Sequence, residues 1–158
     1  MKIYRVLYLV LSIIICCLIF SFSSQTGEVS EGLSQKVTDT AVEVINIGKE
    51  RVSPAHESTE FQQFHTLVRK LAHFSIYTAL GFSVFGFIST FGLARWVVFK
   101  ISVVTCFVYA CSDEFHQSFI SGRGPTFFDV SIDALGAILG IAIIFIAQYI
   151  IEKRKKRA

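Results

Sequence analysis

The stretch LAHFSIYTALGFSVFGFISTFGL, residues 71–93, decides the fold. It contains no Asp, Glu, Lys or Arg, and it is long enough to cross a bilayer, since a spanning helix needs about 20 mostly apolar residues. Three more runs of this kind cover about residues 4–22, 96–112 and 130–151. The third contains Lys100, which lies close enough to the end of its run for the ammonium group to reach the interface. The sequence therefore predicts an all-α integral membrane protein with a bundle of four spanning helices.

The composition supports this class over a soluble domain. The 158 residues are 53% hydrophobic and only 17% charged, whereas a soluble domain is about 45–50% apolar and about 25% charged. A chain of this length is expected to form a single domain, here residues 1–158.

The first apolar run has a second interpretation, as a signal peptide. Lys2 and Arg5 provide a basic start, and the small residues near Ser23 resemble a cleavage site. The apolar core of a signal peptide is about 7–15 residues long, however, and this run is longer. We therefore predict an uncleaved first span.

Basic residues are distributed very unevenly between the two sides of the predicted bundle. One side carries Lys2, Arg5, Arg95, Lys100, Lys153, Arg154, Lys155, Lys156 and Arg157, with Glu152 as its only acid. Because basic residues mark the cytoplasmic side, both termini are predicted to be cytoplasmic in a multi-pass protein of the cell membrane. The basic C-terminal run is interpreted as an anchor to anionic lipids, and no nucleic-acid partner is expected.

The long segment 23–69 would then lie outside the cytoplasm. Apolar residues recur there at three- and four-residue steps from Val29 to Ile45, which predicts an amphipathic helix on the membrane interface or over the bundle. Gly48 would end this helix and Pro54 would mark a turn. A second helix is expected to begin near Thr59, with Gln62 completing a capping box, and to continue into the second span.

Polar residues gather at the outer ends of all four spans. Lys70, His73 and Tyr77 share one face of the second span because they are three and four residues apart. The other spans and the short link contribute Ser24, Gln25, Asp113, Glu114, His116, Gln117, Arg123, Asp129 and Asp133. Ionisable groups at membrane depth usually face a bundle interior or a wet cavity. We therefore interpret the set as a site, and predict convergence in one outward-opening pocket for Lys70, His73, Asp113, Glu114, His116, Arg123 and Asp129.

Single members of this set also have simpler interpretations. Lys70 can be a helix-end lysine, Asp129 a charge favoured by a helix N-terminus, and His73 a hydrogen-bonding partner of a neighbouring helix. Gly136-x-x-x-Gly140 predicts close helix packing, within the bundle rather than between chains. The coincidence of the whole set at one depth is stronger evidence for a site than any one residue.

The carboxylates require compensation. Two unpaired charges about 4 Å apart cost on the order of 4 kcal/mol at an effective dielectric constant near 20. Either Lys70 and Arg123 pair with the acids in a prebuilt network, or a divalent metal occupies the space between them. We predict the ion-pair network, since no familiar metal-binding spacing is present and Arg123 lies in the link between the two acid-bearing helices.

As a set, these motifs resemble the VanZ-like family, which is linked to teicoplanin resistance. The similarity is carried by FSSQ at residues 22–25, K-x-x-HF-x-x-Y-x-x-LG at 70–81, DE-x-HQ-x-F at 113–119, GR at 122–123 and D-x-x-x-D-x-x-G-x-x-x-G at 129–140. It extends over about residues 4–150. Asp133 stands where family members often carry Asn, which adds a negative charge here.

The resemblance implies a cell-envelope protein linked to tolerance of lipoglycopeptide antibiotics such as teicoplanin.

Three functions fit the residues. An enzyme acting on a lipid headgroup or lipid-linked envelope precursor would use Asp113, Glu114 or His116 as acid or base, with Lys70 and Arg123 holding a phosphate or carboxylate. A non-catalytic binder would occupy a lipid-anchored ligand, either the lipoglycopeptide or a cell-wall precursor. A structural module would use the polar cluster only to hold four helices together, and a transporter is disfavoured because no ionisable residue lies at a predicted midplane.

Overall fold

The computed structural model describes residues 2–45, 59–124 and 126–157, and this part of the chain is all-helical. Its helices are α1 (Lys2–Ser23), α2 (Gly27–Ile45), α3 (Thr59–Ser89), α4 (Arg95–Gln117) and α5 (Phe127–Lys155). Four of them are long and apolar enough to cross a membrane: α1, the Thr66–Ser89 part of α3, α4 and α5. The prediction of four long apolar helices, with an amphipathic helix after the first, is confirmed.

The helix ends differ from those predicted by a few residues. α3 begins at Thr59 as expected but ends at Ser89, before residue 93, because Gly92 adopts a positive φ of 74° that breaks the helix. α5 begins earlier than residue 130 because Thr126 caps it, accepting a hydrogen bond from the Asp129 backbone N–H at 3.2 Å. The predicted stop at Gly48, the turn at Pro54 and the side chains of the capping box lie outside the described residues.

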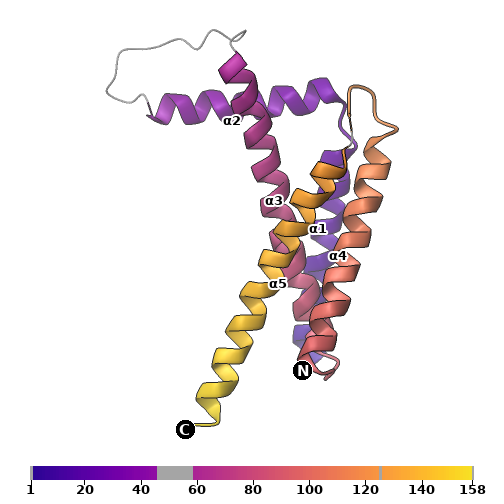
Figure 1. Cartoon of the computed structure of the whole chain (residues 1–158), viewed down its shortest axis with the longest axis vertical. Helices are drawn as coiled ribbons and strands as arrows, with labels where there is room; N and C mark the ends of the chain where they lie inside the picture. The colour runs from indigo at the N-terminus through magenta and orange to yellow at the C-terminus, as the bar shows by residue number, and fades with distance from the viewer. Residues whose placement is uncertain (1, 46–58, 125, 158) are drawn as a thin grey trace.

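Figure 1 shows α1, α3, α4 and α5 running side by side, with both termini and the α3–α4 connection at the same end. α2 lies crosswise over the opposite end, beside the link that joins α4 to α5. We call this opposite end the site end, because the polar residues singled out above lie there. The start of α2 is tied to the link, since the Gly27 N–H donates to the Ser121 carbonyl at 3.1 Å.

The contact between α3 and α5 is the most extensive in the bundle. Glycines allow the two backbones to approach closely: a Cβ placed on Gly136 would overlap the Phe74 carbonyl, and one on Gly140 would overlap the Thr78 carbonyl. Gly81 of α3 is equally close to the Ala137 carbonyl. The glycine motif of α5 therefore packs within the bundle, as predicted.

The centre of the bundle is apolar and its outer surface is too. Tyr77, Phe85 and Ile141 are fully buried between the helices. Large aliphatic and aromatic side chains remain exposed along the whole of α1, α4 and α5. A bundle that is apolar on both its inside and its outside is typical of helices surrounded by lipid.

The amphipathic helix α2 leaves its apolar stripe open. Val29, Leu33 and Val37 are 52%, 43% and 56% exposed, whereas Ser30 on the neighbouring face is buried. The sequence predicted that α2 would either lie on the interface or cover the bundle. Leu33 and Val37 also line a cavity between α2 and the bundle, so α2 covers the site end without filling the space against α1 and α3.

The glycine packing can be tested by substitution. Gly140→Ala should lower the thermal unfolding midpoint in detergent, corresponding to a loss of about 1–3 kcal/mol, because the added methyl group meets backbone that cannot move aside. Gly32→Ala on α2 is the matched control, since nothing lies within 4 Å of its added Cβ. Equal midpoints for the two variants would contradict this account of the α3–α5 contact.

Candidate functional site

A small pocket opens at the site end, between α3, α4 and α5. Its lining residues are Arg69, Lys70, His73, Glu114, Gln117, Arg123, Gly124, Asp129, Ile132 and Asp133. Its volume of about 30 Å³ is enough for a water molecule or a small ion. We call it the polar pocket, and it brings together most of the residues predicted from the sequence.

The rim of the polar pocket is an ion pair between two helices. Lys70 Nζ of α3 lies 3.2 Å from Asp129 Oδ1 of α5, and both side chains are about a quarter exposed. The Lys70 ammonium also lies 4.4 Å from the centre of the Phe128 ring, and Thr126 donates to Asp129 Oδ2 at 2.8 Å. A pair this exposed stabilises the fold by at most about 1 kcal/mol, so its main effect is to fix the two side chains in position.

Deeper in the bundle, Gln117 organises the acids of α4. Its Nε2 group lies 3.3 Å from Asp113 Oδ2, 3.2 Å from Glu114 Oε1 and 3.3 Å from the buried Ser23 hydroxyl. Two N–H groups are thus shared among three acceptors. The Tyr77 hydroxyl donates a further hydrogen bond to Asp113 Oδ2 at 3.2 Å. These bonds hold Asp113 just behind the pocket wall and Glu114 in the wall itself.

Two carboxylate oxygens are left without a hydrogen-bond partner among the described residues. They are Oε2 of Glu114, a residue 6% exposed, and Oδ2 of Asp133, a residue 1% exposed. An unsatisfied buried polar group typically costs about 1–3 kcal/mol, and more when it is charged. The polar cluster is therefore not the fully paired network expected of a group whose only role is to hold helices together.

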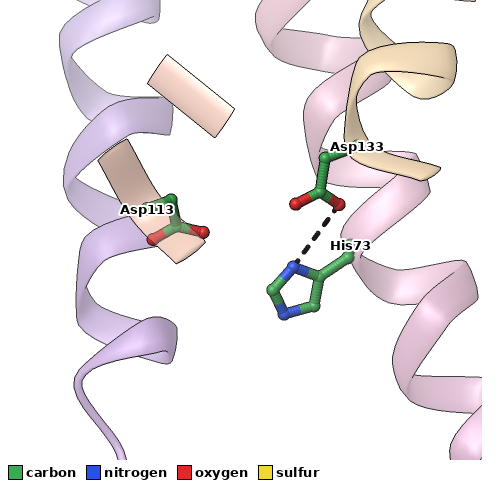
Figure 2. A group of neighbouring side chains, drawn as sticks. All are labelled: His73, Asp113 and Asp133. Carbon is green, nitrogen blue, oxygen red and sulfur yellow. Dashed lines mark ion pairs between the residues drawn. The ribbon is translucent and has the colours of Figure 1, made fainter. Parts of the chain in front are cut away.

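His73, Asp113 and Asp133 come from three different helices and face a common space, as Figure 2 shows. His73 Nδ1 lies 3.6 Å from Asp133 Oδ1, which is longer than an ordinary hydrogen bond. One possible ligand atom from each of the three residues lies within 4.8 Å of the other two. One imidazole and two carboxylates are groups that can hold a cation.

Arg123 differs from its prediction. Among the described residues it forms no ion pair with a carboxylate. Instead it donates to the carbonyl oxygens of Phe22 and Gln25, at 3.0 Å and 3.1 Å, and approaches Gln117 Oε1 at 3.5 Å. The prediction that it pairs with an acid is wrong, because its donors go instead to carbonyl groups at and just beyond the end of α1.

The Arg123 guanidinium lies in an unusual electrostatic setting. Partial burial lowers its pKa from the ordinary value, and the nearby Arg69 cation lowers it further. The carboxylates of Asp113 and Glu114 oppose this pKa shift. An arginine stays charged under such conditions, so two cations remain close together at the pocket.

His116 and Ser24 lie outside the polar pocket, although the sequence predicted that His116 would converge with the others. The His116 ring stacks on Phe20 of α1, with 4.7 Å between ring centres, and its Nε2 lies 3.2 Å from the Ser24 hydroxyl. His116 follows Glu114 by only two residues, so the two side chains lie on different faces of α4. This pair links α1 to α4 beside the site.

A second, larger cavity of about 320 Å³ adjoins the polar pocket beneath α2. Its lining residues are Ile19, Phe22, Gln25, Ser30, Leu33, Ser34, Val37, Val68, Arg69, Ala72, His73, Ile76 and Arg123. We call it the apolar cavity, since most of these side chains are hydrocarbon. Arg69, His73 and Arg123 line both spaces, so these two cations and the imidazole form the boundary between them.

Sequence reasoning missed Arg69 and the apolar cavity. Arg69 is four residues before His73, so helical spacing would have placed it on the same face. The cavity has no such signal, because its walls come from α1, α2, α3 and the α4–α5 link, and helical spacing does not show how these segments pack.

The fold and site together define a small helical membrane protein with one polar site at an end of its bundle. The chain belongs to the VanZ/LLP1 family, whose model matches residues 8–148. This confirms the resemblance seen in the motifs. Comparisons with curated proteins and with solved structures found no match.

Proposed function

We propose that this VanZ/LLP1 protein binds a membrane lipid with an anionic headgroup and acts on that headgroup. The observation that supports this is the junction of the polar pocket with the apolar cavity at Arg69, His73 and Arg123. A lipid has the same two parts in the same order: an apolar chain would occupy the cavity, and its headgroup would reach the polar pocket.

The charge of the boundary favours an anion. Arg69 forms no hydrogen bond or ion pair with another described residue, and it lies close enough to Arg123 to disfavour the second positive charge. A phosphate or carboxylate between the two guanidinium groups would relieve that repulsion and accept charge-assisted hydrogen bonds from both. Arg69 thus takes over part of the anion-binding role first assigned to Lys70, which is paired with Asp129.

Glu114 is the residue best placed for proton transfer. It lines the polar pocket, Gln117 holds one of its oxygens, and the other oxygen has no partner within the described chain. A carboxyl group positioned in this way can act as general acid or base toward a bound headgroup. The unpaired oxygen also argues against a purely structural role, while a binder without catalysis remains the alternative that the experiments below separate.

We also propose that the site end faces away from the cytoplasm. The termini and the α3–α4 connection lie together at the opposite end, and these segments carry nine basic residues that flank the spans, against Arg69, Lys70 and Arg123 at the site end. The positive-inside rule assigns that end to the cytoplasm. The lipid would then belong to the outer leaflet.

Cysteine labelling tests this orientation. In a chain whose four native cysteines are replaced, Thr40→Cys on α2 should react with a membrane-impermeant maleimide in intact cells. Lys156→Cys should react only after permeabilisation. The reverse pattern would overturn the orientation and move the proposed lipid to the inner leaflet.

Family membership supports a role in the cell envelope, and we propose tolerance of lipoglycopeptides such as teicoplanin as its physiological output. Such antibiotics carry an acyl chain, and the precursors they bind are themselves lipid-linked. Both therefore combine hydrocarbon, which the apolar cavity would hold, with polar groups that would lie at the arginines of its boundary.

Expression in a susceptible bacterium tests function and mechanism together. The wild-type chain should raise the minimal inhibitory concentration of teicoplanin more than that of a glycopeptide without an acyl chain. Arg69→Gln should abolish the effect because it removes an anion-binding cation, whereas Lys36→Gln on the exposed face of α2 should retain it. Glu114→Gln preserves shape but not proton transfer, so it should also abolish the effect if the protein is an enzyme.

Comparing which variants lose the teicoplanin effect separates an enzyme from a non-catalytic binder, provided that the variants reach the membrane in equal amounts. Loss with Arg69→Gln but not with Glu114→Gln would indicate a binder without catalysis. Full activity of both variants would reject the lipid site.

A further inference from the structure

We propose that His73, Asp113 and Asp133 bind one divalent transition-metal ion, such as Mn²⁺ or Zn²⁺. The three side chains project from α3, α4 and α5 into a common space (Figure 2). One imidazole with two carboxylates is a donor set suited to these ions, because imidazole favours Zn²⁺ and carboxylate favours Mn²⁺.

The distances fit a shared ion better than direct bonding. Two ligands that each lie about 2.1 Å from a tetrahedral ion are separated by about 3.4 Å. His73 Nδ1 and Asp133 Oδ1 are 3.6 Å apart, too far for a normal hydrogen bond and close to this separation. One ligand atom from each of the three residues lies within 4.8 Å of the other two, a separation that a small inward shift of the side chains would reduce to that of a shared ion.

Burial supplies the independent reason to expect a cation here. Asp133 is 1% exposed, and its Oδ2 has no hydrogen-bond partner in the described part of the chain. In Figure 2 this oxygen, the one not joined by the dashed line, points toward the side of Asp113. A dication would satisfy it and would also balance the two negative charges of Asp113 and Asp133.

The surroundings resemble those of known metal sites. Ligating carboxylates are normally held by outer hydrogen bonds, and Asp113 accepts such bonds from Tyr77 and Gln117. His73 also lines the polar pocket, so water or a ligand can reach the proposed ion from there. All three ligands come from the protein, so the inference stands apart from the proposed lipid.

Metal binding can be measured on the purified full chain in detergent, after chelation and without added lipid. Titration with Mn²⁺, followed by the loss of the free-ion electron paramagnetic resonance signal, should show saturable binding of one ion per chain. Asp133→Asn should weaken binding by about tenfold or more, because it removes a charged ligand. Glu28→Gln on α2 makes the equivalent change on an exposed acid and should bind like wild type.

A second variant guards against misfolding. His73→Gln should also lose affinity, and the thermal unfolding midpoint of the wild type, but of neither ligand variant, should rise with Mn²⁺. Absence of saturable binding by the wild type, or affinities of both ligand variants equal to that of Glu28→Gln, would overturn the metal site. Neither result would bear on the lipid-binding proposal, which the Arg69→Gln variant tests.

Discussion

The backbone contact between α3 and α5 determines where every group of the site lies. Gly136 and Gly140 leave room for the carbonyl groups of Phe74 and Thr78, so the two helices meet in a fixed register. In that register His73 lies opposite Asp133, and Lys70 lies opposite Asp129. A bulkier residue at either glycine would separate the helices, and the polar pairs would separate with them.

This arrangement concentrates carboxylates at a buried position, where loss of hydration makes a charge unfavourable. Asp113, Glu114 and Asp133 are all buried at the end of an apolar bundle, and no lysine or arginine of the described chain forms an ion pair with them. Lys70 pairs with Asp129 at the rim, and Arg123 holds the end of α1. Buried charges without partners are retained at functional sites more often than elsewhere. The proposed metal would offset the charge of Asp113 and Asp133. The third buried carboxyl group, Glu114, would carry out the proposed proton transfer.

The sequence predicted the helices well because their signals are local. Apolar run length, the basic ends and the three- and four-residue steps of α2 each depend on neighbouring residues. It also predicted which helix ends are polar, since Lys70, Glu114 and Asp129 occur at corresponding depths. What it did not predict depends on contacts between distant segments. Arg123 bonds to the end of α1 rather than to an acid, His116 faces Phe20, and the apolar cavity is lined by three helices and the α4–α5 link. Periodicity shows which face of a helix a residue occupies but not which neighbour that face meets.

We propose that the polar pocket and the apolar cavity together hold an anionic lipid, with Arg69 at their boundary. Native mass spectrometry of the chain purified in mild detergent would detect this lipid. The wild-type chain should retain a bound anionic lipid through delipidating washes, and Arg69→Gln should lose it while Lys36→Gln does not. Equal lipid retention by wild type and Arg69→Gln, or retention of uncharged and zwitterionic lipids alone, would contradict it.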